Sequence, residues 1–395
     1  MPKTPQAIEI VEPQQLDEFC ERCRESKVIG FDTEFVSENR YRPELCLLQV
    51  ATDDEIAIID TIVLDDISAF WDVLTDGEHI SVVHAAREEF LFCLRACGKR
   101  PSNLFDTQLA AAFVGFDYPA AYSNLVYQIL GDHVAKGETR TDWMKRPLST
   151  KQINYAVGDV VHLHALCSRI TEKLENKGRY DWYREEIDNW MSALEILDVT
   201  PQWHRVSGAN RLNRRSLAIL DRLWQVRESE AERKNRSPKR TIPDDLLIEL
   251  SKRGSPKPSS FKAIRGFESR VSRGLHDSIS AAIEEANGLP DDQLPKKMER
   301  SNNLNLGLLG QFLTTVLSVV CRKQKIAANL VGTAQDLRQL AGWWLDMLPK
   351  SETPKLMEGW RAEVVGTVID RALDGKLALR VDKADAKNPL TIEEL

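Results

Sequence analysis

The chain has 395 residues, of which 42% are apolar and 29% are charged, and its formal net charge is −7. This balance is typical of a globular protein of two or three domains, and seven cysteines in a chain this long give no disulfide framework. No uninterrupted apolar run approaches the roughly 20 residues of a membrane span, and residues 1–5 lack a signal-peptide core, so we expect a cytoplasmic protein with no membrane partner.

The first informative element follows a predicted helix. Residues 28–35 read Val-Ile-Gly-Phe-Asp-Thr-Glu-Phe, an apolar strand that we expect to end in Asp32 and Glu34. Side chains at i and i+2 of a strand share a face, so the two carboxylates would lie side by side. Their oxygens suit a hard cation such as Mg²⁺ or Mn²⁺. The alternative is that both acids merely begin a polar loop.

Two short apolar runs come next, at 45–52 and 55–60, separated by Asp53 and Asp54. This pattern predicts a hairpin. With the strand before it, we expect a three-stranded antiparallel meander.

A second acidic motif lies at Tyr155 and Asp159, inside a segment (150–166) whose apolar spacing predicts an amphipathic helix. Residues at i and i+4 share a helix face. A carboxylate that faces the strand acids, beside a hydroxyl that can hold water, would suit metal-assisted hydrolysis.

These motifs resemble a known family. Residues 31–35, 42–45 and 48–49 are similar to the first motif of the DEDDy three-prime to five-prime exonucleases, and 105–110, 141–143, 146–148 and 155–159 are similar to later blocks of its ribonuclease D branch. The resemblance covers about residues 8–180. It implies an α/β ribonuclease H-like exonuclease domain with a mixed sheet flanked by helices.

The resemblance also implies a site. Two divalent cations, Mg²⁺ or Mn²⁺, would be held by four acids, and Tyr155 would orient the attacking water. The implied ligands are Asp32, Glu34, Glu89 and Asp159. Arg42, Lys145 and Arg146 are candidate phosphate contacts, although exposed charges of this kind are often inert.

One motif departs from the family. A predicted strand (80–83) is followed by His84, and the position where the family usually has Asp holds Glu89. Glutamate keeps the charge but is one methylene longer. Asp106 is the other candidate for this ligand, but its surroundings look like the start of a packed helix, where Asp is an ordinary N-cap. We prefer Glu89 and leave Asp106 as the alternative.

After a predicted linker (195–212) the strand signals disappear. Residues 205–273 carry about 18 Lys and Arg against about 8 Asp and Glu, which suggests a basic module attached to an acidic one. This module resembles the helical HRDC domain. Its pattern around Asp245 and Gly266 is repeated roughly 90 residues later, around Asp336 and Gly359, which predicts a second HRDC-like module.

The expected organisation is therefore an exonuclease domain (1–200), an HRDC domain (211–292), a second all-α HRDC-like domain (300–382) and a frayed tail (383–395). We expect deletion of residues 205–395 to leave an active nuclease with weaker, less salt-sensitive RNA binding.

The expected function is release of nucleoside monophosphates from RNA with a free three-prime end, in the maturation of tRNA precursors or other structured RNA. The alternatives are an RNA-binding protein with an impaired exonuclease fold, or a DNA exonuclease that acts with a helicase. The oligomeric state stays open.

Overall fold

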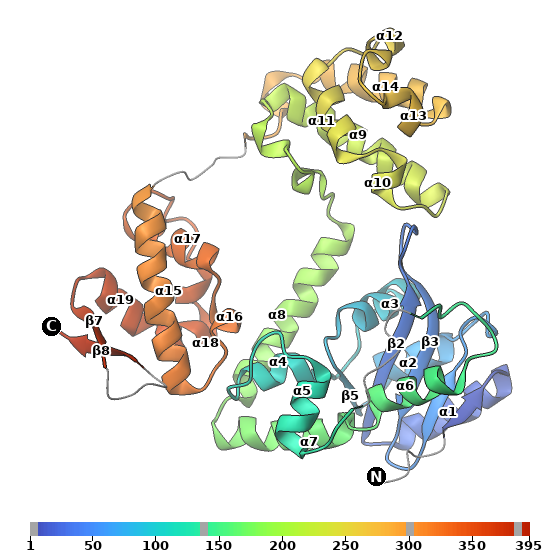
Figure 1. Ribbon diagram of the computed structural model, residues 1–395, viewed down its shortest axis with the longest axis vertical. Coiled ribbons are helices and arrows are strands. Elements are labelled where there is room, and N and C mark those ends of the chain that lie inside the picture. Colours follow the sequence, from blue (N-terminus) through green and yellow to red (C-terminus); the bar gives the residue numbers. More distant parts are fainter. Residues whose placement is uncertain (1–6, 135–140, 298–303, 383–388) are drawn as a thin grey trace.

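The computed structural model describes residues 7–134, 141–297, 304–382 and 389–395. The chain forms an α/β domain and two helical bodies (Figure 1). The long helix α8 joins the first helical body to the α/β domain, and the second helical body lies on the left in Figure 1. The bounds of the first domain are β1 Ile8–Ile10, α1 Pro13–Glu25, β2 Val28–Val36, β3 Glu44–Ala51, β4 Ile56–Ile59, α2 Ser68–Asp76, β5 Ile80–Val83, α3 Arg87–Cys97, β6 Leu104–Asp106, α4 Thr107–Ala112, α5 Tyr122–Leu125, α6 Thr150–Val160, α7 Leu163–Asn176 and α8 Tyr180–Val199.

The α/β domain is built on a six-stranded sheet in the order β1-β4-β3-β2-β5-β6. β2, β3 and β4 pair in antiparallel fashion, which confirms the predicted meander, and β5 and β6 continue the sheet from β2 in parallel. The sheet is therefore mixed, with helices on both faces, as expected.

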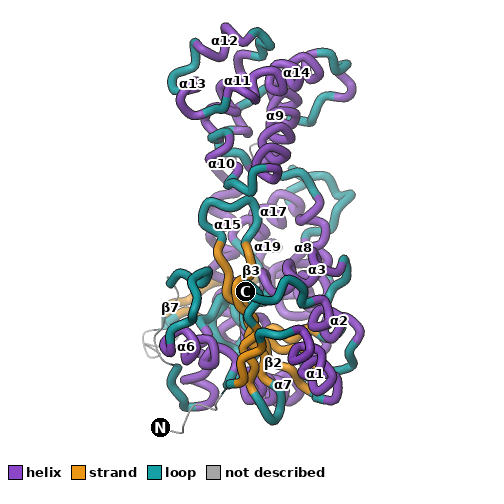
Figure 2. Tube along the Cα trace, turned by 90° about the vertical axis from the view of Figure 1, so that its right-hand side faces the viewer, coloured by secondary structure: helices purple, strands orange, loops and turns teal. Residues whose placement is uncertain are grey.

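The prediction that β2 ends at the two acids was wrong. β2 continues to Val36, which pairs with Glu44 of β3, and the ladder shifts register after Glu34. The hairpin therefore extends beyond the acids, and its tip reaches toward the first helical body (Figures 1 and 2). Cross-strand pairing with β3 keeps this segment extended.

The first helical body comprises α9 Arg214–Arg233, α10 Pro238–Thr241, α11 Asp244–Arg253, α12 Pro258–Lys262, α13 Phe267–Arg270 and α14 His276–Asn287. Its apolar core, which includes Leu217, Leu247 and Phe267, is separate from the core of the α/β domain. This independence is consistent with the predicted HRDC module.

The second helical body comprises α15 Leu304–Gln324, α16 Ala328–Val331, α17 Ala334–Trp344, α18 Gly359–Arg361 and α19 Thr367–Leu373. The internal repeat is visible here. Gly266 and Gly359 both have positive φ (76° and 49°), and each is followed by a buried aromatic, Phe267 and Trp360. A glycine is needed at such turns because other residues rarely adopt positive φ.

The tail prediction was wrong for residues 390–394. β7 (Leu377–Val381) and β8 (Leu390–Glu394) form a two-stranded antiparallel sheet against α15 and α19, so this body is not purely helical. Residues 383–388 of the predicted tail lie outside the described residues.

α15 has a further property. Over Leu306–Gln324 it is long and apolar enough to span a membrane by length and composition, with 39% of that window buried in the protein. The same test is passed by core helices of proteins without a membrane span, and α15 packs against α17 and α19.

The second helical body is docked firmly on the α/β domain, and the two share one continuous core. At the junction the buried Glu186 of α8 accepts two hydrogen bonds from Arg361, both of 2.7 Å, and one of 3.0 Å from Nε1 of Trp360. Trp360 also packs on Phe113. Removing residues 205–395 would expose the part of the α/β core that the second helical body covers. We therefore revise the deletion expectation: the truncated domain should be unstable.

The Arg361 ion pair provides a direct test of this docking. Arg361→Ala leaves the Glu186 carboxylate buried without its partner, which typically costs about 3–5 kcal/mol. We expect the melting temperature to fall by about 10 °C. Arg371→Ala is the matched control, because its ion pair with Glu394 in the same body is exposed to solvent and should contribute little to stability. If both substitutions lower the melting temperature by the same small amount, the ion pair between Arg361 and Glu186 does not stabilise the docked arrangement.

Candidate active site

Three of the predicted acids lie together. Asp32 and Glu34 extend from β2 and Asp159 from α6, and one carboxylate oxygen from each lies within 4.8 Å of the others. The face they occupy is defined by Gly30, two residues before Asp32: a Cβ placed there would lie 2.9 Å from Cβ of Leu163 in α7. The strand acids therefore share the face of the sheet that α6 and α7 cover.

α6 is positioned by its own sequence. Ser149 caps its N-terminus by accepting from the backbone N–H of Gln152, whose side chain accepts in return from the Ser149 backbone N–H. Ala156 and Val160 are buried in the core. Asp159 lies in this same stretch of helix, one turn after Tyr155, and the interaction with Tyr155 lowers the pKa of its carboxyl.

The electrostatics of this cluster are those of crowded, partly buried acids. Burial and the neighbouring carboxylates raise the pKa of Glu34 to about 8, and burial raises the pKa of Asp159 to about 7 although Tyr155 opposes the shift. Asp32 has its pKa raised well above the usual range by burial first and by Glu89, Asp159 and Glu34 next. Divalent cations would relieve this repulsion, so the donor set fits the hard cations that the motif predicted.

These shifts give the metal-free protein a pH-dependent stability. The folded-state pKa values lie above the unfolded values of about 4, so the folded state binds more protons between about pH 4 and 8. Stability is then greatest at the acidic end of this window and is lost as pH rises through 7 to 8. We expect the melting temperature in EDTA to fall by roughly 5 °C or more from pH 5 to pH 8, and Mn²⁺ to reverse the fall. A melting temperature that does not depend on pH would contradict the clustered acids.

Glu89 contacts β2 from helix α3, through Thr33. It lies in the first turn of α3, is buried, and its Oε1 accepts a 2.6 Å hydrogen bond from the Thr33 hydroxyl. Burial raises its pKa to about 7, and it is near enough to Asp32 to raise the pKa of that acid. Glu89 is not one of the three acids whose oxygens converge, so its assignment as the fourth ligand stays a prediction.

Asp106 has a structural role. It is the N-cap of α4, and its two carboxylate oxygens accept hydrogen bonds of 2.8–3.3 Å from four backbone N–H groups. The donors are Ala85, Ala86, Gln108 and Leu109. Its carboxylate thus links the N-terminus of α4 to the loop before α3. This is the helix N-cap role that we preferred for Asp106 from the sequence.

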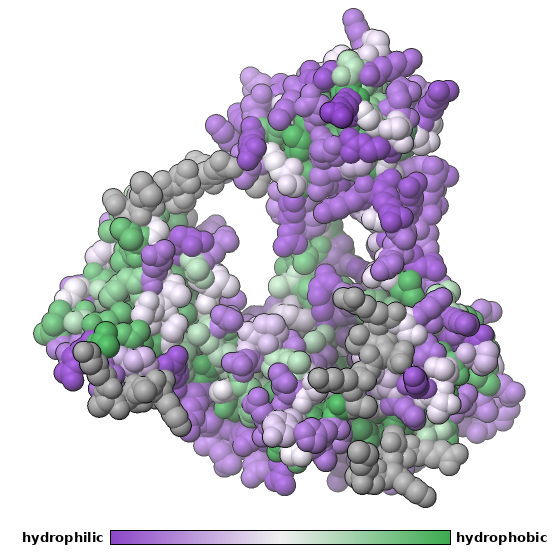
Figure 3. Space-filling view, in the orientation of Figure 1, coloured by the Kyte–Doolittle hydropathy of each residue, from purple (hydrophilic) through white to green (hydrophobic). Residues whose placement is uncertain are grey.

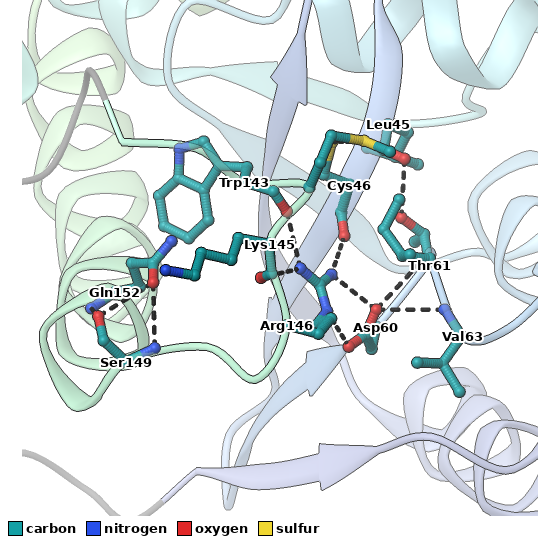
Figure 4. A network of polar contacts seen from close by, with 12 residues as sticks. Leu45, Cys46, Asp60, Thr61, Val63, Trp143, Lys145, Arg146, Ser149 and Gln152 are labelled. Atoms are coloured by element: carbon teal, nitrogen blue, oxygen red, sulfur yellow. Dashed lines mark hydrogen bonds and ion pairs between the residues drawn. The ribbon is translucent and has the colours of Figure 1, made fainter.

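The prediction that Arg146 contacts phosphate was wrong. All five of its N–H donors are used inside the protein: two go to the Asp60 carboxylate, and the others to the backbone oxygens of Cys46, Trp143 and Lys145 (Figure 4). A guanidinium has five donors in total. Arg146 therefore anchors the loop before α6 to the sheet and has no donor left for a phosphate.

The other two basic candidates lie in different places. Lys145 is exposed, and Figure 4 shows its side chain on the side of Trp143 and Gln152, away from the Asp60 network. Arg42 is near the tip of the β2–β3 hairpin, with its guanidinium 3.8 Å from the Glu232 carboxylate of α9. Phosphate contact by these two residues stays a prediction.

Sequence reasoning missed Thr33. It lies between the two strand acids and was assigned no role, yet its hydroxyl donates a hydrogen bond to Glu89. The available signal was the alternation of the strand, which places Thr33 on the opposite face from Asp32 and Glu34.

The chain is similar to known nucleases. Residues 8–175 match the 3'-5' exonuclease family, and residues 216–283 match the HRDC domain. Over 97% of its length the chain is 34% identical to Ribonuclease D of Gluconacetobacter diazotrophicus, and it covers 97% of that protein. The chain belongs to the ribonuclease D family.

Other members agree. Ribonuclease D of Zymomonas mobilis is 31% identical over 95% of the chain and 96% of its own length. The crystal structure of RNase D from Escherichia coli superposes with a TM-score of 0.81 at 25% identity, covering 94% of this chain and 99% of that one. The protein is therefore a three-prime to five-prime exoribonuclease, and the predicted exonuclease and HRDC folds are confirmed. The alternatives of an impaired or DNA-directed enzyme are not favoured.

Proposed function

We propose that the protein shortens structured RNA, such as tRNA precursors, from a free three-prime end, by hydrolysis that uses two divalent cations. The convergence of Asp32, Glu34 and Asp159 is the observation that carries this proposal. Glu89 would complete the set of ligands. Cations held there would lower the pKa of the attacking water and stabilise the leaving oxygen.

The residues around the acids have defined tasks in this scheme. Tyr155 orients the attacking water, because it lies one turn before Asp159 on the same face of α6. Trp143 packs 6.1 Å from the Tyr155 ring, centroid to centroid, and limits its movement. The phenol stays protonated at neutral pH because burial and the nearby acids raise its pKa.

The choice of substrate rests on two supports. The E. coli protein with the similar fold is described as an exoribonuclease involved in structured RNA processing. In this chain the HRDC body carries the basic excess, and its exposed Arg236 and Lys257 have no acidic partner among the described residues. Basic surface of this kind would hold the RNA backbone by its phosphates.

The proposed setting is a reducing, cytoplasmic one. All seven cysteines are free, and six of them are buried. Separation of cell extracts followed by detection of the protein would test this part of the proposal.

The proposed reaction is tested with end-labelled substrates. Single-stranded RNA, a tRNA precursor with a three-prime extension and single-stranded DNA of matched length are incubated with Mg²⁺, Mn²⁺ or EDTA. We expect nucleoside monophosphates from the RNA substrates with either metal, none in EDTA, and little release from DNA. Equal release from DNA, or release in EDTA, would contradict the proposal.

Tyr155→Phe tests the role of the phenol. The change removes only the hydroxyl, so we expect hydrolysis to slow by about 10²-fold, the low end for a positioned proton-handling group, with little change in Mn²⁺ affinity. Turnover and calorimetric titration measure the two quantities. Loss of metal binding in this variant would instead give Tyr155 a structural role.

A further inference from the structure

The buried amide of Gln49 has no hydrogen-bond partner. Gln49 lies in β3 with no exposed surface, and neither its Nε2 nor its Oε1 is hydrogen-bonded within the described part of the chain. Leaving a buried donor or acceptor unsatisfied costs about 1–3 kcal/mol. An apolar residue of similar size would avoid that cost, so the amide calls for an explanation.

Strand register places this amide beside the acid cluster. Gln49 is directly opposite Asp32 in the antiparallel β2–β3 ladder. Directly opposed residues share a face of the sheet, with Cβ atoms about 4.5–5.5 Å apart. This shared face is the one that α6 and α7 cover. Gly30 and Ala51 are the next opposed pair with side positions on the same face, and His164 of α7 is hydrogen-bonded to the backbone of both.

The other direct neighbours of Gln49 on this face are apolar. Leu47 and Ala51 precede and follow it on the same face of β3, and Ile58 is opposite it on β4. Among these sheet neighbours, Asp32 alone offers an acceptor for the amide N–H. Among the described residues, no side-chain donor reaches the Asp32 carboxylate.

We infer that Gln49 is a positioning residue: when the cation binds, its Nε2 donates to the Asp32 carboxylate and holds that carboxylate in the orientation that binds the cation. Carboxylates that ligate metals are usually held by such hydrogen bonds, and loss of the holding group typically costs 10- to 100-fold in metal affinity or activity. The inference rests on the proposed metal site and adds to it a residue outside the set of ligands.

The test separates positioning from a structural role by two readouts. Gln49→Met keeps the length of the side chain and removes both polar atoms, and Gln49→Leu is the second variant. Mn²⁺ affinity is measured by calorimetric titration, and the melting temperature is measured in EDTA. We expect Mn²⁺ affinity to fall 10- to 100-fold in both variants, with the metal-free melting temperature unchanged or higher, because an unsatisfied buried amide has been removed.

Ser81→Ala is the matched control. Ser81 of β5 is equally buried, its hydroxyl is also without a partner, and it pairs with Ile29 and Leu104 and not with an acid of the cluster. We expect this variant to bind Mn²⁺ like the wild type. Wild-type Mn²⁺ affinity in both Gln49 variants would overturn the inference, as would an affinity loss that is accompanied by a lower metal-free melting temperature in both.

Asp32→Asn is titrated in parallel, to distinguish failure of the inference from failure of the proposed function. If Asp32→Asn also keeps wild-type Mn²⁺ affinity, the metal site is wrong and the role of Gln49 falls with it. If Asp32→Asn loses Mn²⁺ binding while both Gln49 variants keep it, only the inference about Gln49 is wrong.

Discussion

Asp32→Asn is expected to reduce RNA hydrolysis by about 10²- to 10³-fold, while the protein still folds and binds RNA. Asparagine has the volume of aspartate but no charge, so the change removes a cation ligand without opening a cavity. Loss of a group that stabilises the transition state electrostatically commonly costs about 3–4 kcal/mol, which corresponds to a rate loss of this size. Turnover of end-labelled RNA with saturating Mg²⁺ or Mn²⁺ is the measurement.

A second readout accompanies this change. Burial and three neighbouring acids raise the pKa of Asp32, so its removal relieves repulsion, and the metal-free variant should melt at or above the wild-type temperature at pH 8. Asp72→Asn, an exposed acid on α2, is the control and should leave both activity and stability unchanged. Turnover above about a tenth of the wild-type value would contradict the metal assignment.

The second large effect concerns the fourth acid. Glu89→Gln is expected to be nearly inactive, and Glu89→Asp is expected to stay active or to exceed the wild type, because it restores the side chain usual in the family. A neutral amide at a metal site loses charge, whereas a shortened acid loses only reach. The hydrogen bond from Thr33 is the contact that a shorter side chain has to re-form. Full activity of Glu89→Gln would show that our assignment of the fourth ligand is wrong.

Asp106→Asn completes this comparison. Its carboxylate accepts from four backbone N–H groups, and an amide NH₂ cannot accept, so at least one buried N–H would lose its partner. We expect a loss of about 2–4 kcal/mol in stability, with turnover per folded molecule retained. If Asp106 were the ligand, activity would be lost instead, and Glu89→Gln would remain active.

Much of the site could be predicted from the sequence because it depends on local periodicity. The i, i+2 spacing of Asp32 and Glu34 puts both on one face of β2, and the i, i+4 spacing of Tyr155 and Asp159 puts both on one face of α6. Both rules follow from backbone geometry alone. The approach of Asp159 to the two strand acids was expected, and the structure places one carboxylate oxygen from each of the three within 4.8 Å of the others.

The hydrogen-bond partners of a basic residue could not be predicted from the sequence. Arg146 looked like a phosphate contact, because an arginine between a tryptophan and a proline carries no local sign of its partners. Its five acceptors come from three separate segments, around Cys46, around Asp60 and around Lys145. The role of such a side chain is decided by which segments the fold brings around it.

The arrangement of the helical bodies was likewise decided in three dimensions. Figure 3 shows the second helical body set against the α/β domain, whereas the HRDC body meets that domain at α8 and at the tip of the β2–β3 hairpin, where the Ser237 N–H donates to the backbone oxygen of Asn39 and Arg42 lies 3.8 Å from Glu232. The internal repeat predicted two similar modules, but no pattern within a module shows whether its core joins that of the α/β domain. The difference lies in side chains of the α/β domain, such as Glu186 and Phe113, that complete the core of the second module.

The sequence by itself thus determined the family, the strand and helix that carry the acids, and the helical character of the second half. All of these follow from patterns a few residues long. Tertiary structure alone decided the structural role of Arg146, the pairing of β7 with β8, the docked interface at Arg361 and the place of Gln49 opposite Asp32. The physical reason is that hydrogen-bond partners and burial are set by segments distant in the chain, so the local pattern does not reveal them.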